Sequence, residues 1–412
     1  MLMSHLEASI QELIFLMHPS PESFWRDRRR QLMLAPGAAQ LNAGTLSPTP
    51  RPVFDAVTRL RRLQAEGPTD FLVRQGPALI QRSRARLAAF LHADPADLLL
   101  LPNVTLAINV VAASVPLRRG DEVLMTDHEY GAMAACWRRR AAASGATVRE
   151  LRLPVDVEDP GVVVEAFRRA IGRRTRVLHF SHVTCTTGLV VPAAAVCAMA
   201  RRRGLVTVVD GAHAPGMVPV DLGRIGADFY GANGHKWLMA PAGCGFLHAR
   251  RSRKTILRSV VTSWGWGYPP ARRERDSGWG GSFWQRDFEF LGVADRTPQM
   301  VLPEVLAFRR PLGGEAAIAR RVRALSDYAR ARLAGVGLVP ATPENPALRG
   351  ALLAFGIPAR AARTLRERIW RRHRVETAVS SAAGRHFLRL SIGWFNTREE
   401  IDRLARAIQS IL

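Results

Sequence analysis

Four side chains capable of acid–base or covalent chemistry lie close together in residues 205–237. An apolar run rich in β-branched residues ends on Asp210, and His213 follows three residues later. A second apolar run leads into a glycine-rich turn that carries His235 and Lys236. Short apolar runs bounded by turn residues are typical of strands buried on both faces of a parallel sheet. Because open α/β sheets bind ligands beyond the carboxyl ends of their strands, we expect these side chains at one rim.

Lysine is rare in this chain, which makes the position of Lys236 informative. Lys and Arg together number 59, yet only Lys236 and Lys254 are lysines. Arginine carries the same charge but stays protonated and cannot form a Schiff base. A lysine kept between glycines and Trp237 therefore predicts covalent attachment of an aldehyde cofactor, and the nearby acid and histidines suggest pyridoxal phosphate. Lys254 stands in a run of arginines, where we expect an ordinary surface lysine.

Length and charge limit the other classes of function. A chain of 412 residues with 47% hydrophobic residues can bury a large core in two or three domains. The net charge of +24 raises a nucleic-acid hypothesis, but the arginines are spread along helix-like stretches and rarely alternate with aromatic residues. We therefore expect non-specific attraction to polyanions at low salt and no specific recognition of nucleic acid.

The apolar runs and the cysteines indicate the cellular compartment of the protein. Nothing near the N-terminus is typical of a signal peptide, and the apolar patch at 13–17 is too short to span a membrane. The four cysteines are scattered, and no CxxC pair is present. We therefore expect reduced thiols in a cytoplasmic protein, with no membrane contact and no metal site.

A candidate anion site lies where a short apolar strand over 98–101 meets a predicted helix. Asn103, Val104 and Thr105 stand at this junction. A hydroxyl and free backbone N–H groups at a helix N-terminus favour an anion such as phosphate. The alternative is an ordinary helix cap, in which Asn103 or Thr105 satisfies the first turn. Beside Lys236, the junction becomes a candidate phosphate site.

His128 and Arg389 are further candidates, each with an ordinary alternative. His128 follows a predicted strand over 122–126, where it could lie over a pyridine ring or shuttle protons, or could simply cap a loop. Arg389 lies within a predicted strand over 387–391, on the face opposite its apolar neighbours. It could form a salt bridge at the rim or a bidentate clamp for a carboxylate.

The order of elements predicts an α/β fold. Strands and helices alternate through 98–243, which favours a mostly parallel sheet with right-handed crossovers, followed by an antiparallel or edge strand at 244–248. We expect a large cofactor-binding domain over 41–300 and a smaller α+β domain over 301–412. Residues 1–40 are predicted as a helical lead-in that packs on the small domain or on a partner. The aromatic loop from Trp264 to Tyr268 could shape a pocket or pack between subunits.

Six motifs resemble the class V aminotransferase superfamily, which contains fold-type I pyridoxal-phosphate enzymes. The resemblance is strongest to the isopenicillin N epimerase-like branch, and it covers most of the chain. The motifs, in the order of the family, are PNVTLAIN (102–109), GDEVLMTDHEYGA (120–132), SHVTCTTG (181–188), VDGAHAPG (209–216), GANGHKW (231–237) and LRLSIGWFNT (388–397). A lone glycine-rich GNGHK would not be specific, and it is no Walker A loop because His235 precedes the lysine.

The resemblance implies a role for each candidate residue around pyridoxal phosphate. Lys236 would form the Schiff base and then move protons at the substrate's α-carbon. Asp210 would pair with the ring nitrogen, His213 would lie near the phenolic oxygen, and His128 would stack on the ring. The phosphate would be held by Val104, Thr105, Asn233 and His235.

The resemblance also implies a substrate site and a homodimer. Arg389 would bind the α-carboxylate of an amino-acid-like substrate, with Asn42 beside it, and Cys185 would belong to the cofactor loop. Two departures stand out. Relatives often carry Gly-Thr-x-Asp, whose threonine reaches the phosphate of a neighbouring subunit, but this chain has Val293 at that position, which puts the contact in doubt. Desulfurase-like relatives tend to have Asn where this chain has Cys185.

The reaction itself is less determined than the cofactor. A desulfurase needs a mobile nucleophilic cysteine from the small domain, and no cysteine follows Cys244. The remaining reactions are epimerisation or racemisation, elimination as in a C–S lyase, and transamination, all of which would use Lys236, Asp210 and Arg389. We favour epimerisation at the α-carbon of an amino acid or small peptide. A non-catalytic basic binding protein on the same fold is the alternative from another class.

Overall fold

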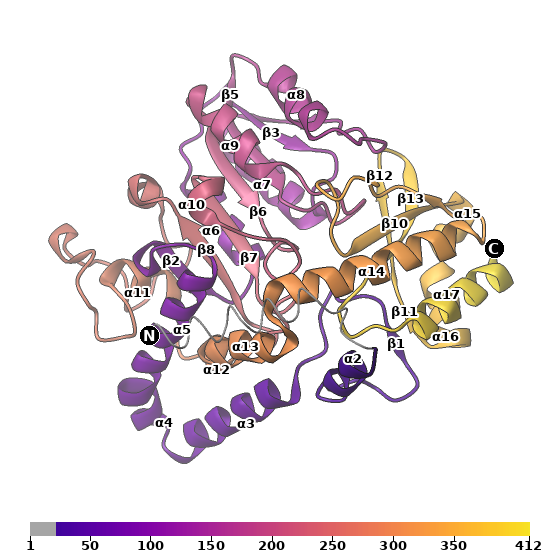
Figure 1. Ribbon diagram of the computed structural model, residues 1–412. Helices are drawn as coiled ribbons and strands as arrows, with labels where there is room; N and C mark the ends of the chain where they lie inside the picture. Colours follow the sequence, from indigo (N-terminus) through magenta and orange to yellow (C-terminus); the bar gives the residue numbers. More distant parts are fainter. Residues whose placement is uncertain (1–21) are drawn as a thin grey trace.

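The computed structural model describes residues 22–412, and its centre is a seven-stranded sheet (Figure 1). The strand order is β2-β8-β7-β6-β5-β3-β4, and β8 alone runs antiparallel to its neighbours. The strands are β2 Leu98–Leu101, β3 Glu122–Thr126, β4 Thr147–Leu151, β5 Thr175–Ser181, β6 Val206–Asp210, β7 Phe229–Asn233 and β8 Gly245–Ala249. The mostly parallel α/β sheet was predicted correctly. The antiparallel strand is β8, which lies inside the sheet between β2 and β7.

Both faces of this sheet are buried except at the edge strand β4, which is largely exposed. Successive residues of each strand point to opposite sides. Leu98 and Leu100 of β2 belong to one apolar cluster, and Leu99 and Leu101 belong to another. Fully burying a leucine side chain contributes about 1.5–3 kcal/mol, so strands that are apolar at every position favour this three-layer arrangement. One face is covered by α6 Val104–Ser114, α7 Gly131–Ser144 and α11 Phe283–Glu289. The other is covered by α3 Arg51–Glu66, α5 Gly76–Phe90, α8 Pro160–Ala170, α9 Ala193–Arg202, α10 Leu222–Ile225 and α13 Leu302–Arg309.

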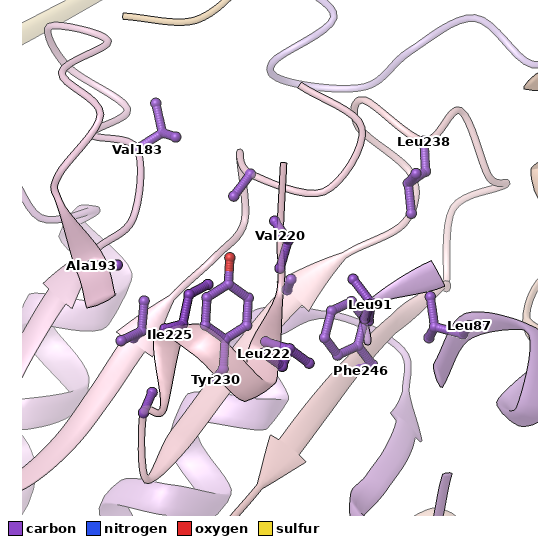
Figure 2. Close-up of a cluster of buried hydrophobic side chains, with 14 of the residues drawn as sticks. Leu87, Leu91, Val183, Ala193, Val220, Leu222, Ile225, Tyr230, Leu238 and Phe246 are labelled. Atoms are coloured by element: carbon purple, nitrogen blue, oxygen red, sulfur yellow. The ribbon is translucent and has the colours of Figure 1, made fainter. Parts of the chain in front are cut away.

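Tyr230 shows how this core also supports the rim of the sheet. Its ring, on β7, stacks on Phe246 of β8 with centroids 6.5 Å apart, and Leu222 and Leu91 lie around it (Figure 2). The buried hydroxyl bonds His182 Nδ1 at 2.9 Å, and burial raises the pKa of the phenol well above its ordinary value. Because its ring packs in the apolar core and its hydroxyl is hydrogen-bonded, Tyr230 links β7 to the loop that follows β5.

A second, smaller sheet lies toward the C-terminus. Its order is β12-β13-β10-β9, all antiparallel, and α14 Gly314–Ala334 runs between the two parts of the molecule (Figure 1). Its strands are β9 Val339–Pro340, β10 Leu352–Ile357, β12 Ala378–Ala382 and β13 Arg385–Ser391, and its remaining helices are α15 Ala359–Ala362, α16 Leu365–His373 and α17 Arg398–Ile411. The predicted small α+β part is thus present around this sheet, and β12 was not predicted because its small polar residues carry little apolar alternation.

The N-terminal segment packs against this smaller part. α2 Glu22–Arg29 places Trp25 against Trp394, with ring centroids 5.9 Å apart, and β1 Ala39–Gln40 pairs in parallel with β11 Val375–Glu376. The first 21 residues of the predicted lead-in lie outside the described residues. α13 lies beyond residue 300 yet packs on α3 and α5 beside the large sheet. None of the helices described is both long enough and apolar enough to cross a membrane.

Candidate active site

One cavity gathers most of the predicted site residues at the carboxyl ends of the parallel strands. It encloses about 900 Å³, partly open to solvent, which is in the range of small-molecule sites. The predicted residues on its wall are Val104, Thr105, Cys185, Asp210, His213, Asn233, His235, Lys236 and Arg389. Two smaller cavities, of about 480 and 200 Å³, hold none of these residues, so the side chains capable of chemistry line the most spacious of the three. The rim expected from the ends of β6 and β7 is therefore present.

The N-terminus of α6 opens onto this cavity. Asn103 caps the helix, its Oδ1 accepting the backbone N–H of Leu106 at 2.9 Å. Asn233 ends β7, and its Oδ1 accepts the N–H of Val104 at 2.9 Å. The ordinary cap and the anion site are thus compatible, because the cap leaves Val104 and Thr105 on the cavity wall. Asn233 fixes the position of the helix end, where the dipole favours a phosphate.

Asp210 provides a buried carboxylate at the middle of the rim. It ends β6, directly opposite Ser181 of β5 in the strand register. Its Oδ1 accepts the N–H of Ala212 at 2.8 Å. Burial raises the pKa of this carboxyl, against the opposing effects of that hydrogen bond and of Lys236. A cationic ring nitrogen facing Asp210 would remove this penalty, so the residue fits the role that the resemblance implies.

Lys236 is held by a chain of two hydrogen bonds. The indole Nε1 of Trp237 donates to His213 Nδ1 at 3.3 Å, and His213 Nε2 lies 3.1 Å from Lys236 Nζ. Because Nδ1 accepts, the proton of the neutral imidazole is on Nε2, and Nζ must accept it as a free amine. Burial lowers the pKa of Lys236 to about 8, and burial also lowers the pKa of His213 well below its ordinary value. The geometry therefore favours the neutral, nucleophilic amine.

Arg389 reaches the cavity from the smaller sheet. Its Nη1 donates to the carbonyl oxygen of Cys185 at 2.9 Å, and its Nη2 lies 3.3 Å from Asn42 Oδ1. In the part of the chain that the structure describes, it forms no ion pair with a carboxylate, which favours the clamp over the rim salt bridge. Asn42 is not on the cavity wall; it orients the guanidinium and also accepts the hydroxyl of Thr45 at 3.0 Å. Burial raises the pKa of the Cys185 thiol, so it is not a thiolate.

His128 lies behind the wall of the cavity rather than on it. Its Nδ1 is 2.9 Å from Asp127 Oδ1, and its carbonyl oxygen accepts the hydroxyl of Thr186 at 3.3 Å. The aromatic ring on the cavity wall at this strand end is Tyr130, two residues further along. The ring-stacking role of His128 stays a prediction, and Tyr130 is a site residue that sequence reasoning missed. Its place within the motif TDHEYGA was the available signal.

Glu129 and Ser181 were also missed. Ser181 lies on the cavity wall, and its hydroxyl donates to Glu129 Oε2 at 2.6 Å while its N–H donates to Oε1 at 3.2 Å. Thr126, at the end of β3, donates its hydroxyl to the same carboxyl. Burial raises the pKa of Glu129 to about 7, although these hydrogen bonds oppose the shift. One buried carboxyl thus joins the ends of β3 and β5 beneath the cavity.

The expectation for Lys254 was wrong, because this lysine is buried with 3% of its surface exposed. Its Nζ donates to Glu274 at 2.8 Å and to the carbonyl oxygen of Ala96 at 3.0 Å. It also lies 4.2 Å from the centre of the Trp284 ring. These partners come from distant parts of the sequence, so the arginines beside Lys254 gave a false indication of exposure.

Within residues 22–412, no group of three His, Cys, Asp or Glu is placed to hold a metal ion.

Comparison with known proteins identifies the family. The family described as "Aminotransferase class-V" matches residues 41–267, so the chain belongs to it. Isopenicillin N epimerase of Amycolatopsis lactamdurans is 43% identical over 94% of this chain and 98% of its own length. The enzyme of the same name from Streptomyces clavuligerus is 42% identical over the same shares. The predicted class V family and its epimerase-like branch are confirmed.

A solved structure supports the fold. A mutant of C-DES, with glycine covalently linked to the PLP cofactor, superposes with a TM-score of 0.79 at 21% identity, covering 93% of this chain and 99% of its own. This likeness confirms the fold-type I architecture. Family membership and the cavity together make the chain a pyridoxal-phosphate enzyme, as predicted.

Proposed function

We propose that this enzyme epimerises an amino-acid-like substrate at its α-carbon, and that isopenicillin N is the first substrate to test. The observation that carries the proposal is the match, over nearly the whole length of both chains, to two enzymes named isopenicillin N epimerase. A single cavity that holds Lys236, Asp210 and Arg389 supports it, because deprotonation at an α-carbon needs a base, an electron sink and a carboxylate clamp.

The residues of the cavity fit pyridoxal phosphate from its phosphate end to its ring nitrogen. When bound, this coenzyme supplies an electron sink for the α-carbon. Val104 and Thr105 at the α6 N-terminus, with His235, would hold the phosphate, and Asn233 keeps that helix end in place. Asp210 would keep a proton on the ring nitrogen through a charge-assisted hydrogen bond.

Lys236 and Arg389 would then act on the substrate. The free amine of Lys236, favoured by its lowered pKa of about 8, accepts the α-proton. Arg389 binds the α-carboxylate through its guanidinium, which Asn42 and the Cys185 carbonyl already orient. A substrate held at its carboxylate presents its α-carbon to Lys236 in each encounter, which lowers the entropic part of the barrier.

The competing reactions differ in what they need besides these residues. A desulfurase needs a thiolate nucleophile, but all four cysteines precede residue 245, and the thiol on the cavity wall, Cys185, has a raised pKa. A C–S lyase or an aminotransferase would use the same three residues and remains the alternative to be separated by experiment. A non-catalytic basic protein would have no use for a partly buried lysine with a lowered pKa.

Several broader features belong to the same proposal. We infer a cytoplasmic homodimer with a cofactor-binding domain over 41–300 and a small domain over 301–412. Four free cysteines agree with a reducing compartment. The aromatic loop supports an interface between subunits, because Trp264 and Trp266 expose 81% and 68% of their surfaces.

The test is incubation of the yellow holoenzyme with isopenicillin N and with a panel of free L- and D-amino acids in deuterated water. Epimerisation predicts solvent deuterium at the α-carbon together with loss of optical purity, without net loss of the amino group. Release of ammonia with sulfide or a keto acid would show elimination, and transfer of the amino group to an added keto acid would show transamination. A colourless protein that takes up no coenzyme would contradict the proposed function in all its forms.

A further inference from the structure

Inversion at an α-carbon places a geometric demand on the cavity. The C–H bond on one face breaks and a C–H bond on the opposite face forms, so an acid must reach the face that Lys236 does not. The position of Lys236 limits its own reach, because Nζ is held 3.1 Å from His213 Nε2, and His213 is fixed by Trp237. The structure should therefore contain a second proton carrier across the cavity.

Most polar groups on the cavity wall already form hydrogen bonds or lie on the same side of the cavity as Lys236. The hydroxyl of Ser181 donates to Glu129, and that of Thr45 donates to Asn42. His213 bonds Lys236 itself, and His235 is its neighbour in sequence. Thr105 would hold the phosphate and Asp210 would face the ring nitrogen. Two other groups on the wall that can lose a proton then remain: the phenol of Tyr130 and the thiol of Cys185.

The strand order places Tyr130 across the cavity from Lys236. Lys236 follows β7, and Tyr130 follows β3. The two strands between them in the sheet are β6 and β5 (Figure 1). These strands end in Asp210 and Ser181, which are paired in the register. A coenzyme ring seated against Asp210 would therefore have Lys236 on the β7 side of Asp210 and Tyr130 on the β3 side.

The hydroxyl of Tyr130 is also free to act. The side chain is 54% exposed, and no partner of its hydroxyl occurs within the described residues. Two of the other three tyrosines use their hydroxyl in a hydrogen bond: Tyr230 with His182 and Tyr328 with Asp402.

Position on the sheet separates Tyr130 from Cys185. Both groups lie near the Arg389 guanidinium, which would hold the carboxylate attached to the reacting carbon. The thiol also interacts with Lys236. Cys185 follows β5, whereas Tyr130 follows β3, one strand further from Lys236 in the sheet.

We propose that Tyr130 is a catalytic residue that exchanges a proton with the α-carbon on the face opposite Lys236, which rests on the proposed epimerisation. In one direction the Lys236 amine takes the α-proton, and the electron pair of the broken C–H bond is retained by the bound substrate and coenzyme. The Tyr130 hydroxyl then gives its proton to the other face, where that electron pair forms the new C–H bond. A proton passes from the Lys236 ammonium to the Tyr130 phenolate through solvent, which restores both groups.

The test compares Tyr130→Phe with wild type, using isopenicillin N and its inverted isomer in deuterated water. We expect inversion to fall about 10²- to 10⁴-fold, the usual contribution of one acid–base group. The isomer whose α-proton faces Lys236 should still exchange that proton for deuterium with retention. The visible absorption of the bound coenzyme should be unchanged. Tyr328→Phe, which removes a phenolic hydroxyl bonded to Asp402, is the matched control and should invert normally.

Each other outcome overturns the assignment in its own way. Inversion by Tyr130→Phe within a few-fold of wild type would show that Lys236 serves both faces. Loss of inversion with retained exchange in Cys185→Ser, but not in Tyr130→Phe, would transfer the role to the thiol. Loss of coenzyme absorption in Tyr130→Phe would assign the ring to cofactor binding. If the wild-type holoenzyme exchanges the α-proton yet never inverts, epimerisation itself is refuted, and the need for a second carrier disappears with it.

Discussion

The two lysines of this chain, Lys254 buried and Lys236 partly buried, occupy sites of opposite kinds. Lys254 Nζ is surrounded by oxygen: Glu274 at 2.8 Å, the Ala96 carbonyl at 3.0 Å and Asp97 at 3.5 Å, with the Trp284 ring below it. Lys236 Nζ has a nitrogen neighbour, His213 Nε2, and forms no ion pair with a carboxylate among the residues described. The first site is built for an ammonium ion, and the second is built for a free amine.

This difference teaches that burial alone does not make a lysine reactive. Desolvation penalises the charged form of any buried lysine, but oxygen ligands and a carboxylate compensate for that penalty. Lys254 has such compensation and fills a structural role between the 94–97 turn and the loop at Glu274. Lys236 has much less, so its pKa falls to about 8 and its amine can react with an aldehyde.

Replacing each lysine by arginine should separate the two sites most strongly. Lys236→Arg keeps the charge but cannot react with the coenzyme, so we expect loss of the visible absorption and a fall in activity of at least about 10³-fold. Lys236→Ala serves as the companion variant, because it removes the amine without adding volume. Lys254→Arg should keep the yellow colour. Borohydride reduction that still fixes the coenzyme to the Lys236→Ala chain would refute covalent attachment at this residue.

Removing the charge at Lys254 should affect stability and not the coenzyme. Lys254→Met leaves the buried Asp97 with only the exposed Arg251, 3.9 Å away, as a cation and removes the contact with Trp284. Breaking a buried ion pair from one side costs about 3–5 kcal/mol, and we expect about 3 kcal/mol here because Glu274 is half exposed. Urea unfolding of the apoprotein measures the change, and the holoenzyme spectrum is the control. A loss below about 1 kcal/mol would mean that Lys254 is not a structural cation.

The pH dependence of coenzyme attachment should give the smallest and most specific effect. Below a pKa of about 8 the neutral fraction of Lys236 grows roughly tenfold per pH unit, so the rate of attachment to the apoprotein should rise and then level off above pH 8. The stability of the apoprotein should also increase with pH. The folded pKa is below the ordinary 10.5, so the unfolded state binds more protons between these values and the apoprotein gains stability as pH rises through that window. Stopped-flow absorbance follows the rate, and a midpoint near 10 would contradict the desolvated amine.

Much of the fold could be read from the sequence because the signals are local. β2 and β3 occur at the predicted residues, since short apolar runs between turn residues have few other ways to bury every side chain. β7 extends to Asn233, three residues further than its apolar run, because pairing with β6 and β8 continues through Gly231 and Ala232. β12 has no such run and is held by pairing with β13, which a single-sequence pattern does not encode.

The sequence by itself determined the chemistry that is written into short segments. An acid after one buried strand, a histidine–lysine pair after the next and a helix N-terminus after a third predicted a coenzyme site, because parallel strands bring their carboxyl ends to one edge. The tertiary structure alone decided which neighbours those groups have. It placed Lys254 under Glu274 and Trp284, brought Arg389 to the Cys185 carbonyl, and put Tyr130 rather than His128 on the cavity wall. The reason is physical: burial and charge compensation depend on contacts between residues far apart in the chain, and these set the pKa and reactivity of each group.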